Sequence, residues 1–186
     1  MFSYIRAIFK WSISKLWSKN KYYNILFIGL DNSGKSSLVQ LLCNKGILFN
    51  TPTNKPNYYE FDFDNQKIKA YDLSGNITLR RLWEEYILSA DALVFLVDAY
   101  DKDRFNEVYE EFYKIKTNNF FHKKPILVLG NKIDFPTASS KEELKNILGI
   151  DESNLNIKLF MCSVIQNYNI KNAFLWLLSN IEAKFG

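Results

Sequence analysis

Residues that hold transition metals or form disulfides are scarce in this chain. Its 186 residues include two cysteines and one histidine. These cannot build a His/Cys metal cluster, and no Ser-His-Asp triad is evident. Cys43 and Cys162 lie far apart in apolar surroundings, which predicts free buried thiols in a reducing compartment. We expect His122, in the polar segment 118–124, to lie at the surface.

Acidic residues are absent from the first 21 positions, and so is any long uninterrupted apolar run. Five basic residues give this segment a charge of +5, while the rest of the chain nets −1. A body without basic excess argues against nucleic acid as a partner. Lysines and serines interrupt every apolar stretch, which excludes a signal-peptide core or a membrane span here. Residue 2 is Phe2 and not glycine, which excludes N-myristoylation.

The same segment carries an apolar stripe at helical spacing, made by Ile5, Ile8, Phe9, Ile13, Leu16 and Trp17, opposite Arg6, Lys10 and Ser14. A basic amphipathic helix with bulky aromatic residues fits an interfacial membrane helix, so residues 1–17 are expected to contact a membrane surface. An ordinary helix packed on the body is the alternative, and the two states can alternate. We therefore divide the chain into a membrane-binding helix, residues 1–20, and one folded domain, residues 21–186.

The most informative motif is G-x-x-x-x-G-K-[ST], which residues 29–36 match in full. An apolar run precedes it and a helical pattern follows it, which is the strand–loop–helix context that a phosphate-binding loop requires and that a chance Gly-rich turn would lack. Lys35 would supply a positive charge to the β- and γ-phosphates, and the Ser36 hydroxyl would ligate Mg²⁺. The motif predicts nucleotide binding by Asp31, Asn32, Ser33, Gly34, Lys35, Ser36 and Ser37.

Two further candidates for the phosphate and metal site follow. The loop 47–57 contains Thr53, a candidate second Mg²⁺ ligand or a plain turn residue. Residues 58–71 predict a β-hairpin with a short turn. It ends in a D-x-x-G pattern, in which Asp72 is expected to hold Mg²⁺ through water and the Gly75 N–H to meet the γ-phosphate.

Residues 131–134 read N-K-x-D directly after a buried strand at 125–129. A carboxylate at Asp134 can accept hydrogen bonds from N1–H and from the exocyclic amine of guanine, and adenine offers no such pair of donors. A polar loop at a strand end is the alternative, but it would have to coincide with two earlier motifs in order. The motif therefore predicts guanine recognition by Asn131, Lys132 and Asp134.

In the rest of the chain, helices alternate with strands. Helices are expected over 79–89, over 103–116, up to 148 and over 170–184, and strands over 92–97, over 125–129 and from 158. The helix that ends near residue 148 begins at a capping box formed by Ser139/Ser140 with Glu142/Glu143. This alternation predicts an α/β fold with a mostly parallel six-stranded sheet, one antiparallel edge strand and helices on both faces. The nucleotide would lie across the carboxyl ends of the strands.

The order of these motifs resembles a Ras-like small GTPase, and the details resemble the Arf/Sar branch. The stretch G-L-D-N-S-G-K at 29–35 is close to that branch's G-L-D-N-A-G-K. A narrower resemblance, to Sar-type GTPases within that branch, rests on five stretches: Asp72-Leu73, Arg80-Arg81-Leu82-Trp83, Phe95-Leu96-Val97-Asp98, Asn131-Lys132-Ile133-Asp134 and Phe160-Met161-Cys162-Ser163-Val164. The resemblance covers essentially the whole chain, including an amphipathic N-terminus without an acceptor glycine.

This resemblance implies a P-loop small-GTPase fold, a GTP-binding domain over residues 21–186, and GTP/GDP with Mg²⁺ as cofactors. It implies a switch protein that recruits vesicle coat subunits to the endoplasmic reticulum in its GTP state and hydrolyses GTP to GDP during transport to the Golgi. An exchange factor and a GTPase activator would be partners, on the cytosolic face of these membranes. It also assigns Thr53 to Mg²⁺, and Ser163 with Val164 to the loop whose backbone contacts guanine.

One departure concerns hydrolysis. Sar-type proteins read D-L-G-G-H where this chain reads D-L-S-G-N, so Asn76 takes the place of the residue that orients the attacking water. Asn76, Gly75 and Lys35 are the expected catalytic residues, with slow turnover. Two alternatives stay open: a GTP-binding module that recruits partners with little turnover, and an Arf-like GTPase of another membrane.

Overall fold

A computed structural model describes residues 22–44, 56–118, 124–151, 153 and 156–185. The predicted N-terminal helix, Thr53 and His122 lie outside these residues. The described strands are β1 (Tyr22–Gly29), β2 (Asn57–Phe63), β3 (Gln66–Asp72), β4 (Ala92–Asp98), β5 (Ile126–Asn131) and β6 (Ile157–Met161). The helices are α2 (Lys35–Leu42), α3 (Leu82–Ile87), α4 (Phe105–Thr117), α5 (Lys141–Leu148) and α6 (Ile170–Phe185), with two short 3₁₀ helices, η2 (Ile77–Leu79) and η3 (Lys102–Arg104).

The strands form one six-stranded sheet in the order β2-β3-β1-β4-β5-β6. Only the edge strand β2 runs antiparallel to its neighbour among the described pairs. Asp64 and Asn65 form the two-residue turn of the β2–β3 hairpin with φ of 50° and 63°, which is the conformation that a tight hairpin turn requires. The predicted α/β fold with one antiparallel edge strand is thus confirmed.

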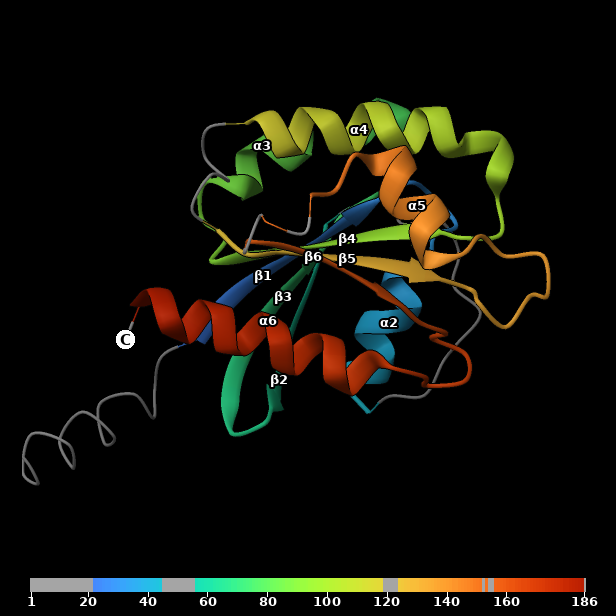
Figure 1. Ribbon diagram of the computed structural model, residues 1–186. Coiled ribbons are helices and arrows are strands. Elements are labelled where there is room, and N and C mark those ends of the chain that lie inside the picture. Colours follow the sequence, from blue (N-terminus) through green and yellow to red (C-terminus); the bar gives the residue numbers. More distant parts are fainter. Residues whose placement is uncertain (1–21, 45–55, 119–123, 152, 154–155, 186) are drawn as a thin grey trace, which may run out of the picture.

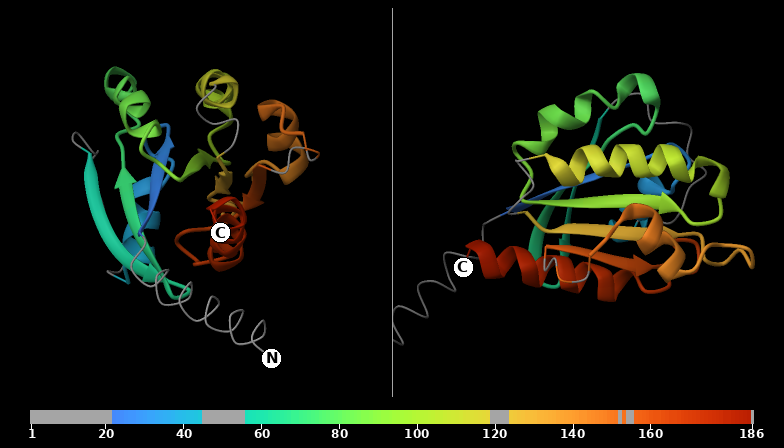
Figure 2. Two further views of the ribbon diagram at one scale, coloured as in Figure 1. Left: turned by 90° about the vertical axis from the view of Figure 1, so that its left-hand side faces the viewer. Right: turned by 45° about the horizontal axis from the view of Figure 1, so that its top comes forward.

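Helices cover both faces of the sheet, as Figures 1 and 2 show. The helices α3, α4 and α5 lie on one face, and α2 and α6 lie on the other. Every residue of β4 and of β5 is buried, because a central parallel strand packs against helices on both sides. This explains why both strands read as continuous apolar runs in the sequence.

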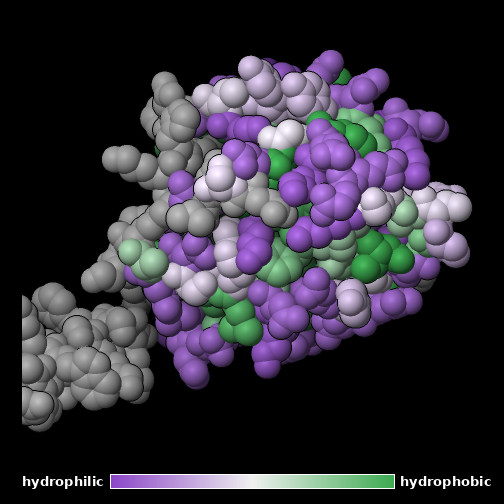
Figure 3. All heavy atoms as spheres, viewed as in Figure 1, coloured by the Kyte–Doolittle hydropathy of each residue, from purple (hydrophilic) through white to green (hydrophobic). Residues whose placement is uncertain are grey.

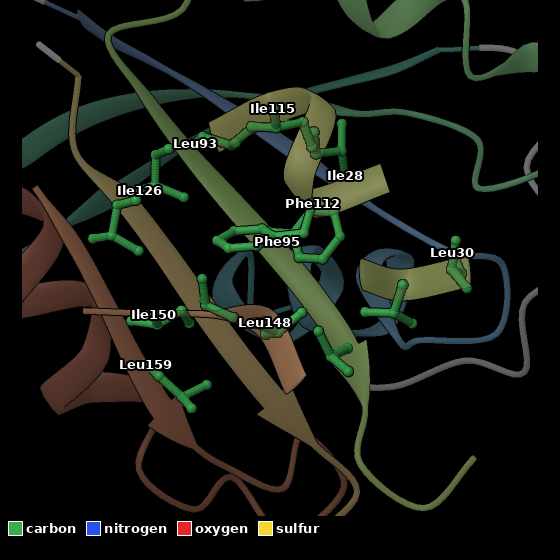
Figure 4. Close-up of a cluster of buried hydrophobic side chains, with 14 of the residues drawn as sticks. Ile28, Leu30, Leu93, Phe95, Phe112, Ile115, Ile126, Leu148, Ile150 and Leu159 are labelled. Carbon is green, nitrogen blue, oxygen red and sulfur yellow. The ribbon is translucent and has the colours of Figure 1, made fainter. Parts of the chain in front are cut away.

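Each face of the sheet has its own apolar core. On the face of α4, the ring of Phe95 from β4 packs against Phe112 with centroids 5.2 Å apart, within the cluster drawn in Figure 4. On the other face, Phe174 of α6 contacts Phe27 at 6.1 Å and Phe63 at 5.6 Å. The two cores fix the sheet, and with it the strand ends that carry the motifs.

The predicted helix over 79–89 is present but shorter than expected. It is α3, which begins only at Leu82, because Leu79 ends η2 and Arg80 and Arg81 lie between the two helices. The Asn76 side chain caps η2 by accepting a hydrogen bond of 3.1 Å from the Thr78 N–H. Arg80 and Trp83 direct their side chains into the protein and are 7% and 3% exposed, so tertiary contacts and not helical propensity set the path.

The face of the molecule drawn in Figure 3 is mixed in polarity. In the view of Figure 3, hydrophilic residues cover most of the described surface, and hydrophobic ones show in separate patches. None of the helices in the described part of the chain is both long enough and apolar enough to cross a membrane.

Candidate nucleotide-binding site

The loop between β1 and α2 follows a path that requires glycine at two positions. Gly29 has φ of 137° and Gly34 has φ of 99°, angles that side chains with a Cβ rarely adopt. A Cβ at Gly29 would lie 2.2 Å from the carbonyl oxygen of Leu96, and one at Gly34 would lie 2.4 Å from Nδ2 of Asn131. Both glycines of the motif are therefore explained by the structure, with Asn32 at φ of 61° between them.

Lys35 is the first residue of α2, directly after this loop, and is only 6% exposed. Its Nζ donates a hydrogen bond of 2.7 Å to the carbonyl oxygen of Leu30. Burial lowers the pKa of Lys35 to about 8, although the charges of Asp72 and Asp31 oppose this shift. An ammonium group has three protons to donate, so Lys35 can bind phosphate oxygens in addition to Leu30. Negative phosphate charge would favour its protonated form.

A buried carboxylate and a hydroxyl meet beside Lys35. Ser36 Oγ donates a hydrogen bond of 2.6 Å to Asp72 Oδ2. The other oxygen, Asp72 Oδ1, is buried and has no hydrogen-bond partner in the described part of the chain. Burial raises the pKa of Asp72, while the Ser36 hydrogen bond and the Lys35 charge lower it.

An unsatisfied buried carboxylate oxygen next to a hydroxyl matches the hard oxygen ligands that Mg²⁺ prefers. The two described candidates for the metal site, Ser36 and Asp72, therefore fit the ion. The third candidate, Thr53, lies outside the described residues.

The predicted base-recognition residues come together at the ends of β5 and β6. Asn131 Nδ2 donates to the carbonyl oxygen of Ser33 at 2.9 Å, and its Oδ1 accepts from the Val164 N–H at 3.0 Å. Ser163 Oγ donates to Asp134 Oδ1 at 2.6 Å. One amide thus joins the phosphate loop to the loop after β6, and a serine holds one oxygen of the carboxylate that would read guanine.

Lys132 has φ of 69°, and its Nζ lies 2.6 Å from Asp98 Oδ2. Asp98 ends β4 and is buried. Asp98 belongs to none of the three nucleotide-binding motifs and was given no role from the sequence. Its position as the last residue of a strand that neighbours the N-K-x-D strand is the signal that could have identified it.

The loop after β3 packs directly on the phosphate loop. A Cβ at Gly75 would lie 2.1 Å from the backbone nitrogen of Asp31, so only glycine fits there. The next residue, Asn76, is exposed. Its Oδ1 accepts hydrogen bonds from the N–H and the hydroxyl of Thr78 at 3.1 and 3.0 Å. The catalytic role of Asn76 stays a prediction, and the structure places its carboxamide on η2.

The carboxyl ends of the parallel strands thus gather the predicted nucleotide-binding residues: Asp31, Asn32, Ser33, Gly34, Lys35, Ser36, Ser37, Gly75, Asn131, Lys132, Asp134, Ser163 and Val164. Lys35, Ser36 and Ser37 form the first turn of α2, where backbone N–H groups lack intrahelical acceptors and favour anions. The arrangement can hold a chain of phosphates at one end and a purine base at the other.

Comparisons with known proteins agree with this geometry. Residues 9–181 match the model of the ADP-ribosylation factor (Arf) family. The chain is 36% identical over 181 residues to the small COPII coat GTPase SAR1 of Giardia intestinalis, with 91% of this chain and 95% of that protein covered. It is 30% identical over 162 residues to ADP-ribosylation factor-like protein 3 of Caenorhabditis elegans, with 85% of this chain and 87% of that protein covered.

The fold also matches a solved structure, the Arl6 BBS3 small GTPase of Trypanosoma brucei with the bound nucleotide analogue GppNp. The TM-score is 0.79 at 24% identity, and the match covers 88% of this chain and 99% of the other. The family match spans nearly the whole described body and includes the residues that the phosphate and base loops need. The chain belongs to the Arf family of small GTPases, which bind GTP and GDP with Mg²⁺ and hydrolyse GTP.

Proposed function

We propose that this protein is a Sar-type switch that recruits vesicle coat subunits to the endoplasmic reticulum when it holds GTP. The observation that carries the proposal is the 36% identity to a SAR1 GTPase over 95% of that protein's length. A second SAR1 relative, from Dictyostelium discoideum, is 34% identical over 166 residues. The competing proposal is an Arf-like GTPase that acts at another membrane, since ADP-ribosylation factor-like protein 3 of Caenorhabditis elegans aligns at 30% identity.

Within the site, the bound Mg²⁺ would neutralise charge on the β- and γ-phosphates. Ser36, Asp72 and Thr53 would hold the ion, and Lys35 would donate hydrogen bonds to the same phosphates. The Gly75 N–H would meet the γ-phosphate, and Asn76 would occupy the position from which the attacking water is oriented, with the slow turnover that its contacts to Thr78 imply. These roles rest on the hydroxyl–carboxylate pair of Ser36 and Asp72 and on the burial of Lys35.

Guanine would be read by Asp134, with Asn131, Lys132, Ser163 and Val164 shaping the base loop. We expect Asp134→Ala to bind GTP at least about 10²-fold more weakly than the unmodified protein, because guanine loses the carboxylate that accepts its two hydrogen bonds. In sites built around such a buried partner, losing it can reduce discrimination by roughly 10⁴-fold. Nucleotide affinities measured by fluorescence titration test this role. Comparable affinity of the unmodified protein for ATP and GTP would contradict it.

Residues 1–17 would serve as a reversible membrane contact on the cytosolic face of the endoplasmic reticulum and the Golgi. The support comes from the apolar stripe and the +5 charge of residues 1–21. An exchange factor, an activator and coat subunits would then bind the nucleotide-dependent surface of the folded domain.

Recruitment of purified COPII coat subunits to liposomes tests the proposed function. The protein loaded with a non-hydrolysable GTP analogue should recruit them, and the GDP-loaded protein should not. The Giardia SAR1 GTPase serves as the positive control and the Caenorhabditis factor-like protein 3 as the negative control. If the SAR1 control recruits coat and this protein does not, the Arf-like alternative replaces the proposal.

A further inference from the structure

Two buried side chains hold consecutive carbonyl groups in the loop that contains Gly75. Trp83 Nε1 donates a hydrogen bond of 3.0 Å to the carbonyl oxygen of Ser74. Arg80 Nε donates one of 2.8 Å to the carbonyl oxygen of Gly75. Trp83 is 3% exposed and Arg80 is 7% exposed, so neither donor can exchange its carbonyl freely for water.

These two carbonyl groups belong to the two peptide planes that flank the Gly75 Cα. A trans peptide unit is planar, and its C=O and N–H point in opposite directions. The Trp83 hydrogen bond to the Ser74 carbonyl therefore fixes the direction of the Gly75 N–H. The Arg80 hydrogen bond fixes the next plane, so both backbone dihedrals of Gly75 are determined.

Without these hydrogen bonds Gly75 would be the most adaptable residue of its loop, because glycine accepts a wide range of φ and ψ. Its position cannot be taken over by another residue, since a Cβ would lie 2.1 Å from the Asp31 nitrogen. The loop thus combines a residue that must be glycine with two side chains that remove its conformational freedom.

Arg80 is itself held by acidic residues of α4. Its Nη2 lies 2.7 Å from Glu107 Oε1, and its Nη1 lies 3.4 Å from Glu111 Oε1. Nη2 also lies 3.9 Å from Asp31 Oδ1 in the phosphate loop, so three carboxylates compensate the charge of the buried guanidinium. The loop after β3 is thereby anchored to α4 through one arginine.

We propose that Trp83 and Arg80 are positioning residues that aim the Gly75 N–H at the γ-phosphate. The inference rests on the proposed role of Gly75. A donor that meets only the γ-phosphate contributes to GTP binding and not to GDP binding. Losing its orientation should therefore change the ratio of the two affinities, whereas a general loss of packing would weaken both nucleotides alike.

The test compares Trp83→Phe and Arg80→Lys with matched controls elsewhere on the protein. Phenylalanine removes the indole donor, and lysine cannot reproduce the fixed geometry of the Nε donor. Trp176→Phe on α6 and Arg81→Lys, an exposed position, make the same chemical changes away from the Ser74 and Gly75 carbonyls. Dissociation constants for GDP and for a non-hydrolysable GTP analogue are measured by fluorescence titration in the presence of Mg²⁺.

We expect the affinity ratio of GTP analogue to GDP to fall about tenfold in Trp83→Phe and Arg80→Lys, equivalent to about 1.4 kcal/mol. The ratio should stay within about twofold in both controls. An equal loss for both nucleotides, or no loss, would overturn the inference and leave Trp83 and Arg80 as packing residues.

A Gly75→Ala variant tests the proposed role of Gly75 by itself, because the added Cβ would force the loop after β3 away from the Asp31 nitrogen and displace the Gly75 N–H. If it lowers the ratio while Trp83→Phe and Arg80→Lys leave it unchanged, the positioning role is overturned and the proposed role of Gly75 stands. If Gly75→Ala also leaves the ratio unchanged, Gly75 does not meet the γ-phosphate and both fall.

Discussion

Asn76 illustrates how one residue can be committed to a local structural task. Its Oδ1 accepts two hydrogen bonds from Thr78, one from the N–H and one from the hydroxyl. A carbonyl oxygen has two lone pairs, so this oxygen has no free lone pair with which to orient a water molecule. The side chain is also shorter than glutamine. Both facts favour slow intrinsic hydrolysis.

We therefore expect Asn76→His to hydrolyse GTP roughly tenfold faster than the unmodified protein, or more, in single-turnover measurements with and without an activator. The imidazole reaches further and does not reproduce the carbonyl acceptor for Thr78, and tenfold corresponds to about 1.4 kcal/mol of barrier. Misplacement of a catalytic group by about 1 Å can cost on the order of 10²-fold, so the gain is well within range.

Asn172→His on the exposed first turn of α6 is the control for adding an imidazole. Indistinguishable rates for Asn76→His and the unmodified protein would mean that Asn76 already works, for example through a bridging water.

The two cysteines differ in their surroundings, although the sequence predicted buried thiols at both positions. Cys162 is buried, whereas Cys43 is only partly buried at the end of α2. Burial raises the pKa of Cys162 to about 12, and the charge of Asp134 adds to the shift. Because the thiolate is the reactive form, only about one Cys162 thiol in 10⁴ is ionised at pH 8.

Iodoacetamide at pH 8 should therefore modify Cys43 and leave Cys162 intact in the folded protein. Raising the pH from 8 to 10 should increase the Cys162 thiolate fraction only toward about one in a hundred, since the pH stays below its pKa. Mass spectrometry of tryptic peptides measures both sites, and denatured protein provides the fully reactive control. Rapid native labelling of Cys162 would contradict its burial.

Elements defined by contiguous sequence signals were predicted closely, whereas those set by distant contacts were not. The phosphate loop between β1 and α2 follows from its glycines and lysine, and the β2–β3 hairpin follows from its strands and short turn. The late start of α3 follows Arg80, whose side chain bonds Glu107, 27 residues away. No local pattern in the sequence encodes such a contact.

The same distinction applies to the site. The sequence motifs identified four site residues from residue type and spacing alone: Lys35, Ser36, Asp72 and Asp134. The hydrogen bond from Asn131 to the Ser33 carbonyl joins residues 98 positions apart in the sequence. The role of Asp98 becomes visible only in the folded sheet, where β4 and β5 lie side by side. These relationships require the fold.

The N-terminus of α5 allows the contribution of one helix cap to stability to be measured. Ser140 was predicted within a capping box, and its Oγ accepts a hydrogen bond of 3.2 Å from the Glu143 N–H. Gly149 closes the helix with φ of 58°. Ser140→Ala should lower the free energy of unfolding by about 1 kcal/mol, because one N-terminal N–H loses its acceptor.

Denaturant unfolding of the nucleotide-loaded protein measures this change, with the exposed Ser179→Ala on α6 as the control. Because α5 lies outside the phosphate and base loops, nucleotide affinity should not change. A loss below about 0.3 kcal/mol would show that water replaces the cap.

At the scale of the whole molecule, hydrogen bonds between residues far apart in the sequence join the loops that would surround the nucleotide. Asn131 joins the phosphate loop to the loop after β6. Arg104, where η3 meets α4, donates from Nη1 to Asp31 Oδ1 at 3.2 Å and from Nη2 to the Asp31 carbonyl at 3.1 Å. Through such hydrogen bonds one bound phosphate would be able to bias the loop after β3, since that loop packs on Asp31 through Gly75.

The basic segment before β1 is where nucleotide state would reach the membrane. Residues 1–21 carry a charge of +5 and no acidic residue. Each basic side chain near an anionic surface contributes about 1 kcal/mol, and the apolar stripe would add burial in the interface if the segment binds there as proposed.

Sedimentation with anionic liposomes should therefore recover more protein loaded with a non-hydrolysable GTP analogue than protein loaded with GDP. Deleting residues 1–17 should abolish most of the binding in both states. Ile13→Glu and Ser14→Glu add the same charge to the apolar and polar faces of the expected helix. The electrostatic loss is shared by both variants, so a larger loss in Ile13→Glu isolates the contribution of the apolar stripe. Equal binding of the GTP-analogue and GDP forms would leave residues 1–17 as a membrane anchor uncoupled from the nucleotide.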